Sequence, residues 1–306
     1  MRRAILTLLT ASLLGSAAPA AEPSGRRVLG ADRGKVAIVD GAGKVVWEVK
    51  NGYAVHDIAR LANGNVMFQS GPATVVEVAP DKSVVWKYTS KAAGDYKGPV
   101  EVHAFQRLDD GRTMIAETGN KRIIEVDRAG KIVKEVPLRV DHPHPHRDTR
   151  LARKLDNGHY LVCHEGDGVV REYDGAGKVV WSYALTLNGR PRVEGHDGHG
   201  TEVFGALRKA DGNTLIATGN GNRVIEVDPA GKTVWSIERD ELPGIRLFWV
   251  TTPTLLPNGN LVFGNCHAGP ENPQWIEVNR DKKVVWTFND RKTFGNDLAA
   301  ATVIDD

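Results

Sequence analysis

Alternating apolar and polar residues recur along the chain in one short phrase that predicts a β-hairpin. The phrase is an alternating strand, a tight turn rich in Asp, Asn, Gly and Lys, and a second alternating strand. Its six copies begin at residues 36, 75, 123, 170, 224 and 275. Lys134 occupies one position of the second strand in the third copy, and the other five copies place a tryptophan there: Trp47, Trp86, Trp181, Trp235 and Trp286. Aromatic residues that recur once per hairpin pair are typical of β-propellers.

A second phrase precedes five of these copies and also predicts a hairpin. It is a strand, an Asn-Gly or Asp-Gly turn and another strand, at residues 56–68, 103–115, 149–162, 204–216 and 251–263. The chain from Leu61 to Trp86 advances 25 residues, and equivalent stretches in the next three copies advance 26. Two hairpins make a four-stranded unit of nearly constant length joined by variable connections, which is the pattern of propeller blades.

The two ends of the chain supply the parts of one more blade. The tail LAAATVIDD at 298–306 predicts an innermost strand, and residues 26–47 predict the three strands outside it. Joining the two ends removes an open sheet edge that would favour aggregation. The predicted fold is all-β: a six-bladed β-propeller with four-stranded blades, the last closed by the C-terminal strand and the N-terminal strands.

The repeat also decides the state of the two cysteines. Cys163 and Cys266 fall in the third and fifth blades, with a whole blade between them. Neighbouring sheets pack about 10 Å apart, whereas a disulfide needs Cα atoms within about 7 Å. We therefore expect two free, buried thiols.

The N-terminus has the layout of a secretory signal peptide. Arg2 and Arg3 precede an apolar run from Ala4 to Leu14, and small residues follow up to Ala21. The run is shorter than the roughly 20 residues of a membrane-spanning helix. We predict a signal peptide over residues 1–21, a propeller over residues 22–306, and export to the periplasm or the medium. A buried N-terminal helix is the alternative interpretation.

Charge excludes some partners. Removing Arg2 and Arg3 leaves 38 of the 40 basic residues against 38 acidic ones. This balance does not predict a nucleic-acid surface. We expect a small-molecule or carbohydrate ligand, no membrane insertion, and a monomer, because the ring closes on itself.

The histidines are the candidate residues for a functional site. The strand order places the connections between blades, and those between each blade's second and third strands, on one face of the disc. Nine of the ten histidines fall on this face, and only His159 lies in a turn on the other. In the stretch DHPHPHRDTR at 141–150, successive histidines alternate in direction, so at most two can face a common ligand. His146 is favoured over His142 and His144.

This convergence predicts a divalent transition metal of unknown identity, because imidazoles bind such ions and His clusters mark such sites. Glu117 or Glu165 is expected to add a carboxylate, and Arg150 and Arg147 to grip an anionic substrate group. The expected metal ligands are four histidines: His103, His146, His164 and His267.

The repeats also resemble known families. VIEVDPAGKTVWSI is similar to the repeat of pyrroloquinoline-quinone-type propellers, and HDIARLANGN with VEVAPDKSVVWKY resembles the repeats of bacterial arylsulfotransferases. The resemblance covers most of residues 27–306. Quinone-type dehydrogenases have eight blades, so with six blades pyrroloquinoline quinone is not expected. The sulfotransferase resemblance implies a histidine that accepts a sulfuryl group, which corresponds to His56, although His56-Asp57 matches only in part.

Three functions stay open. The leading hypothesis is a metal-dependent lyase or hydrolase acting on a polar, carbohydrate-class substrate, with His56, Arg150, Glu117 and Arg147 as catalytic residues. The second is arylsulfotransferase-like group transfer through a histidine, and the third is a non-catalytic ligand-binding propeller. A single loop histidine is ordinarily a solvated residue. Phe248 and Trp249 fit stacking on a sugar and packing equally well.

Overall fold

The structure is a computed structural model that describes residues 25–186 and 203–304. The predicted signal peptide lies outside the described residues, as do His196 and His199 in segment 187–202. Within the described part of the chain, no helix is long and apolar enough to span a membrane.

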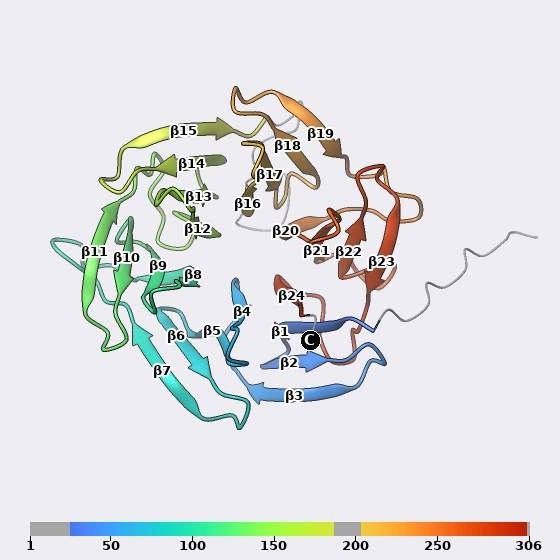
Figure 1. Cartoon of the computed structure of the whole chain (residues 1–306), viewed down its shortest axis with the longest axis horizontal. Helices are drawn as coiled ribbons and strands as arrows, with labels where there is room; N and C mark the ends of the chain where they lie inside the picture. Colours follow the sequence, from blue (N-terminus) through green and yellow to red (C-terminus); the bar gives the residue numbers. More distant parts are fainter. Residues whose placement is uncertain (1–24, 187–202, 305–306) are drawn as a thin grey trace, which may run out of the picture.

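Six four-stranded antiparallel sheets form a ring (Figure 1). The strands of each blade follow one another from the centre of the ring outward. Blade 1 has β4 (Ile58–Arg60), β5 (Val66–Gly71), β6 (Thr74–Val78) and β7 (Val84–Thr89). Blade 2 has β8 (Glu101–Arg107), β9 (Thr113–Thr118), β10 (Arg122–Val126) and β11 (Ile132–Pro137). Blade 3 has β12 (Ala152–Lys154), β13 (Tyr160–His164), β14 (Val169–Tyr173) and β15 (Val179–Ala184).

The remaining blades follow the same order. Blade 4 has β16 (Gly205–Arg208), β17 (Thr214–Ala217), β18 (Val224–Val227) and β19 (Thr233–Ile237). Blade 5 has β20 (Trp249–Leu255), β21 (Leu261–Cys266), β22 (Trp275–Val278) and β23 (Val284–Phe288). Blade 6 has β24 (Ala300–Ile304), β1 (Arg27–Asp32), β2 (Lys35–Val39) and β3 (Val45–Lys50). The six innermost strands are called the hub.

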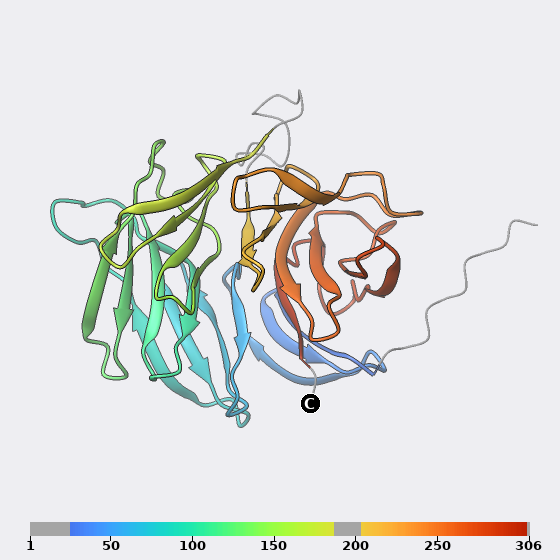
Figure 2. The same cartoon turned by 45° about the horizontal axis from the view of Figure 1, so that its top comes forward.

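Blade 6 closes the ring with both ends of the chain. Strand β24 pairs antiparallel with β1, in a register that runs from Arg27 opposite Ile304 to Ala31 opposite Ala300. Figures 1 and 2 show these two strands side by side, although they come from opposite ends of the sequence. The predicted six-bladed propeller and its mixed closing blade are confirmed.

A buried glutamate on the third strand links most blades to the next. It is the middle residue of the IEV or VEV phrase of the hairpin repeat, which reads REY at Glu172, and its carboxylate meets a cation from the following blade. Blade 6 carries the buried Ile38 at this position instead. The five pairs are Glu77–Arg107 at 2.7 Å, Glu125–Lys154 at 2.5 Å, Glu172–Arg208 at 2.7 Å, Glu226–Arg280, and Glu277–Arg26 at 3.0 Å.

The repeated tryptophans reinforce the same junctions. The indole N–H of Trp181 donates to the Pro229 carbonyl of blade 4 at 2.9 Å, and that of Trp235 donates to the Arg280 carbonyl of blade 5 at 3.0 Å. The Arg208 guanidinium also lies over the Trp181 ring, 4.6 Å from its centroid. The tryptophans therefore pack blade against blade, as the repeat predicts.

Both cysteines are free and buried, which confirms the prediction from their blade positions. Cys163 belongs to β13 of blade 3 and Cys266 to β21 of blade 5.

We predict that the two sides of a blade junction contribute unequally to stability. Glu226 is fully buried, and it accepts from Asn213 at 2.7 Å and from Lys209 at 3.0 Å as well as from Arg280. Glu226→Ala removes the acceptor of all three donors, and we expect a loss of about 3 kcal/mol of unfolding free energy in urea titrations.

Arg280→Ala is the matched change on the other side of this junction. The Arg280 side chain is 54% exposed, and the carboxylate keeps its two other donors, so we expect a loss of only about 1 kcal/mol. Equal losses for the two variants would show that the buried carboxylate does not organise the junction.

Candidate functional site

The histidines gather at one face of the ring. Seven of the eight described histidines lie at or beside the connections between blades or between the second and third strands of a blade. We call this the histidine face. His159 follows the turn between β12 and β13 on the opposite face, called the turn face, where its Nδ1 lies 2.7 Å from Glu172 Oε1. This distribution agrees with the prediction.

The first part of the site is built by a bulge in β8. Val102 pairs with Glu117 and Ala104 with Ala116, so His103 is an extra residue without a partner on β9. A bulge redirects side chains and is common beside functional sites. Here it brings His103 Nε2 to 2.9 Å from Oε2 of Glu101, two residues earlier in the same strand.

The second part comes from the connection between blades 2 and 3. His146 lies in this connection, and its Nδ1 is 2.7 Å from the same Oε2 of Glu101. The connection is anchored by Asp148, whose carboxylate accepts from the backbone N–H of Gly119 at 2.8 Å and of His144 at 2.6 Å. Two imidazoles, one from β8 and one from the connection to blade 3, thus lie within hydrogen-bonding distance of the same carboxylate oxygen.

His56 completes a triangle of imidazoles. Its ring centroid lies 4.4 Å from that of His103 and 6.1 Å from that of His146, and the latter two are 5.0 Å apart. The backbone N–H of His56 donates to the Gln69 side chain at 2.9 Å, which fixes the residue just before β4. Strands β4 and β8 and the connection before β12 therefore bring the three rings to one place on the hub.

Arg150 stands behind two of these rings. It is fully buried; its NH1 lies 3.1 Å from His103 Nδ1, its NH2 lies 3.2 Å from His146 Nε2, and its Nε pairs with Glu165. A guanidinium can only donate, so Arg150 favours the tautomers in which both histidines point a proton at Glu101. Arg150 thus orients the imidazoles from beneath them, rather than projecting into solvent.

The environment shifts the pKa values of this cluster. Burial alone would raise the pKa of the Glu101 carboxyl, but hydrogen bonds from His103 and His146 hold that pKa well below its usual range. Burial, followed by the nearby Arg150 charge, lowers the pKa of His103 to about 4. Burial and the negative charge of Glu101 raise the pKa of Tyr53 to about 12. At neutral pH the cluster holds an ionised Glu101 and a neutral His103.

Glu101, His103 and His146 form a set of donors suited to a metal. One ligand atom from each lies within 4.8 Å of the other two. Two imidazoles and a carboxylate suit divalent transition metals, and three protein ligands leave positions open for water or substrate. With a metal on His103 Nε2, the remaining ring proton would lie on Nδ1, 3.1 Å from the Thr149 carbonyl, which is the kind of acceptor that orients a metal-bound imidazole.

His164 has a different position from the one predicted for a metal ligand. Its Nδ1 is 2.7 Å from the Asp148 carbonyl, and its Nε2 is 2.7 Å from the Tyr173 hydroxyl. Both ring nitrogens are therefore engaged within the protein. Burial, followed by the charge of Arg171, lowers the pKa of His164 to about 4. His164 braces the connection that carries His146.

His267 lies beside blade 6 and is not part of the group with Glu101. Its Nδ1 is 2.9 Å from Asp297 Oδ1, and its ring stacks on Trp249 with centroids 5.1 Å apart. Trp249 is only 7% exposed and meets Phe204 edge to face. Packing is thus what the structure shows for Trp249.

The other predicted residues bind groups around the cluster. Glu117 accepts from Arg122 and Asn120, both at 2.6 Å, within blade 2. Glu165 pairs with Arg150, and the Arg147 backbone carbonyl accepts from Gly166 at 2.9 Å. The structure therefore unites His56, His103, His146 and Arg150, and places the remaining predicted residues outside this cluster: Glu117, Arg147, His164 and His267.

Glu101 is the member of this cluster that the sequence pattern did not single out. Its signal was available, because Glu101 precedes His103 by two residues in the phrase VEVHAF, and alternate residues of a strand share a face. The alignment of blades instead favoured carboxylates at the ends of second strands, where Glu117 and Glu165 lie.

Comparisons with known proteins bear on this geometry. A family model described as outer membrane protein assembly factor BamB matches residues 32–287. No curated protein matches the chain. A structure of a protein of unknown function from Bacteroides caccae is similar at 23% identity and a TM-score of 0.77, covering 92% of this chain and all of that one.

Two further similar structures are those of lyases. A streptogramin B lyase is 13% identical, with a TM-score of 0.58, and the match covers 88% of this chain and 85% of that one. A catalytically inactive histidine-to-alanine variant of virginiamycin B lyase from Staphylococcus aureus, solved with quinupristin, is 13% identical, with a TM-score of 0.54 and coverage of 86% and 83%. At these identities the likeness shows the fold alone.

We predict that His164 makes the protein less stable at acidic pH. Its pKa is about 4 when folded and about 6.5 when unfolded, so the unfolded chain binds more protons between these values. The contribution of neutral His164 to the free energy of unfolding is fully present above about pH 6.5 and is lost as the pH drops towards 4. The advantage of wild type over His164→Gln should shrink by about 3 kcal/mol from pH 7 to pH 4 in urea titrations.

The control for this prediction is His142→Gln, which changes a side chain that is 71% exposed. We expect its stability to follow that of the wild type across the same pH range. Parallel curves for wild type and His164→Gln would contradict the prediction.

Proposed function

The chain belongs to the family described as outer membrane protein assembly factor BamB, and within that family we propose that it is an exported propeller enzyme with a divalent transition metal at Glu101, His103 and His146. The observation that carries this proposal is the convergence of three ligand atoms, one from each residue, within 4.8 Å of one another. They come from a bulged hub strand and a braced connection, so their positions are set by the ring and not by a free loop.

The proposed chemistry is Lewis-acid catalysis. A metal at this site would polarise a carbonyl or lower the pKa of a bound water, and it would leave coordination positions open for substrate. His56 is only 8% exposed and lies against His103, which suits it to accept or deliver a proton beside the metal. The proposed reaction class is a lyase or hydrolase acting on a polar, carbohydrate-class substrate. Two structural neighbours are lyases, which is consistent with the reaction class only.

One observation favours a second candidate, which is proton or group transfer by the histidines without a metal. Arg150 lies within hydrogen-bonding distance of His103 Nδ1 and His146 Nε2, and both rings then donate to Glu101. This network satisfies every one of those groups with protons alone. A metal on His146 Nδ1 would move the remaining proton to Nε2, where it faces the Arg150 donor. Under this candidate His56 would be the acid–base or nucleophilic residue.

We predict that the mature protein binds about one equivalent of a divalent transition metal after chelation and reloading, measured by elemental analysis. Glu101→Gln and His103→Ala should each weaken binding more than about tenfold, because each removes a ligand. His159→Ala on the turn face is the matched control and should bind as the wild type does.

Three outcomes separate the candidates. Metal loss with loss of hydrolysis or elimination on a panel of polysaccharides supports the metal enzyme. Turnover by metal-free protein that requires His56, or label transfer from an aryl sulfate to the protein, would replace it with histidine chemistry. Neither metal nor turnover, with a tightly bound ligand, would leave a binding propeller.

A further inference from the structure

We infer that Gln69 is a positioning residue of the candidate site, because its side-chain amide fixes both His56 and the bulge that carries His103. The two histidines belong to different blades, so neither blade alone sets the distance between their rings. Gln69 lies in β5 of blade 1 and is fully buried. The inference rests on the proposed function, in which His56 moves a proton beside a metal ligand, and Gln69 acts through the two histidines.

The oxygen of the Gln69 amide holds the start of the inner strand of blade 1. Gln69 Oε1 accepts from the backbone N–H of His56 at 2.9 Å and from that of Asp57 at 3.2 Å. Both residues precede β4, which begins at Ile58, so they lie outside the register that pairs β4 with β5. The side-chain oxygen therefore replaces a strand partner and sets where His56 stands on the hub.

The nitrogen of the same amide holds the inner strand of blade 2. Gln69 Nε2 donates to the carbonyl of Val102 at 2.7 Å, and Val102 directly precedes His103 in the bulge. The backbone N–H of Val102 donates to the Pro72 carbonyl at 2.8 Å, which also belongs to blade 1. Blade 1 thus binds both polar backbone groups of the residue before His103.

The bulge is also fastened on its other side. The backbone N–H of Phe105, two residues after His103, donates to Asp57 Oδ2 at 3.0 Å. His103 therefore lies between two attachments to blade 1, and Gln69 is the one that also binds the backbone of His56. In this arrangement the ring centroids of the two histidines are 4.4 Å apart.

The chemistry of these partners requires an amide. Two N–H groups need an acceptor and one carbonyl needs a donor, and a glutamine side chain supplies both from one planar group. The backbone of Gln69 is held as well, because the buried Asn51 donates through Nδ2 to the Gln69 carbonyl at 3.0 Å. The amide is therefore fixed before any ligand binds, as the support of a catalytic constellation requires.

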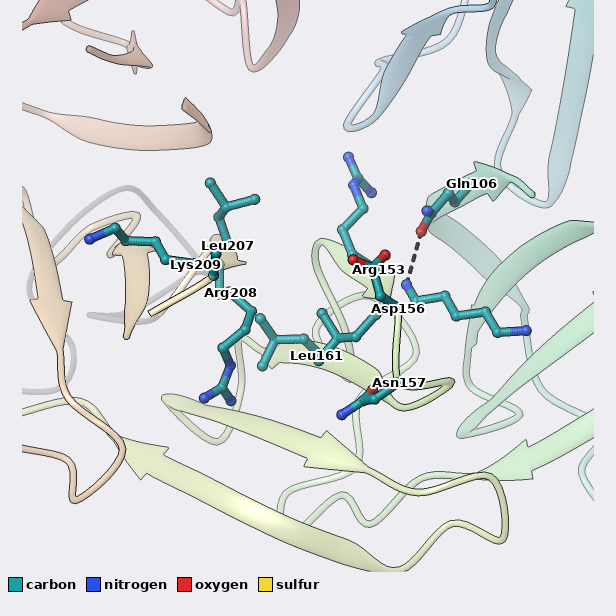
Figure 3. Close-up of a pocket in the computed structure, with 12 residues that line it drawn as sticks. Gln106, Arg153, Asp156, Asn157, Leu161, Leu207, Arg208 and Lys209 are labelled. Carbon is teal, nitrogen blue, oxygen red and sulfur yellow. Dashed lines mark hydrogen bonds between the residues drawn. The ribbon is translucent and has the colours of Figure 1, made fainter. Parts of the chain in front are cut away.

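A second glutamine joins inner strands at the opposite end of the hub. Gln106 in β8 accepts from the backbone N–H of Lys154 in β12 at 2.9 Å, which is the dashed line in Figure 3. This contact links blades 2 and 3 at the turn face. Gln69 links blades 1 and 2 at the histidine face, and it differs because one of its partners is the backbone of a histidine of the cluster.

The test is a nuclear magnetic resonance spectrum of the histidine rings in the metal-free mature protein. Gln69→Asn keeps the amide but shortens the side chain by one methylene, so it cannot reach both His56 and Val102. We expect the ring signals of His56 and His103, assigned by substituting each histidine with glutamine, to shift or broaden. The ring signal of His164 should stay in place.

Gln274→Asn is the matched control. Gln274 directly precedes β22 of blade 5 and is buried, and its amide likewise accepts from a backbone N–H, of Asp290 at 2.7 Å, and donates to a carbonyl, of Gly295 at 2.8 Å. We expect similar losses of stability in urea for the two asparagine variants, but unchanged ring signals of the cluster in the control. The inference is overturned if folded Gln69→Asn leaves both ring signals in place, or if the control displaces them equally.

Gln69→Glu gives a rescue by a side chain of the original length. A protonated carboxyl offers one acceptor and one donor, and burial favours the protonated form. At pH 5.5, where a pKa of about 4 keeps His103 neutral, this variant should restore the ring signals that wild type shows at the same pH. Signals that stay displaced in the folded variant would indicate a general packing defect and would count against the inference.

Metal binding separates this inference from the proposed function. If the wild type binds a divalent transition metal, Gln69→Asn should weaken that binding about tenfold, because the support of the bulge with His103 is lost, and Gln274→Asn should not. If the wild type binds no metal, the proposed metal enzyme fails, and the ring signals of the metal-free protein still decide whether Gln69 positions the histidines.

Discussion

The ring depends on a buried carboxylate at the junction between blades. A glutamate on a third strand is buried, and its charge is tolerated because its own blade and the next blade both supply donors: Glu226 accepts from Asn213 of its own blade and from Arg280 of the next. Glu77 accepts from Arg107, and Glu172 accepts from Arg208, each at 2.7 Å. In blades 1 to 5 the buried carboxylate therefore depends on the next blade for one of its donors. The closing pair of β24 and β1 completes the circle, and there the position is taken by Ile38.

A closed and rigid ring explains how the histidine face acquires precise geometry from irregular connections. The His103 bulge lies in a hub strand, and the connection with His146 is braced through Asp148 by Gly119 and by the buried His164. Both imidazoles therefore reach one oxygen of Glu101 at 2.7–2.9 Å. Arg150 supports them from the core side, so the same group of residues suits either a metal or a pair of protons.

The hub presents different chemistry at its two ends. Imidazoles and a carboxylate gather at the histidine face, whereas arginine and lysine side chains, each paired with a carboxylate, gather at the turn face. Asp57 connects the two ends, because it follows His56 in the chain and accepts from Arg153 at 2.7 and 2.8 Å. Its carboxylate also accepts from the Phe105 backbone at 3.0 Å, which ties the inner strands of blades 1, 2 and 3 together.

The sequence by itself determined the fold, because hairpin periodicity, the tryptophan repeat and the tail at 298–306 are local signals that add up to six blades. It also determined the histidine face, since strand direction follows from strand order, and it named His56, His103, His146 and Arg150. Only the tertiary structure decided which groups meet. Glu101 reaches His103 through a bulge in β8 and His146 through the connection between blades 2 and 3, and Arg150 turns inward to Glu165. The two-residue spacing of Glu101 and His103 was a local signal, but the contacts with His146 and Glu165 depend on tertiary packing. His164 and His267 lie at the ends of second strands in the similar phrases CHEG and CHAG, yet their rings bind the Tyr173 hydroxyl and the Asp297 carboxylate.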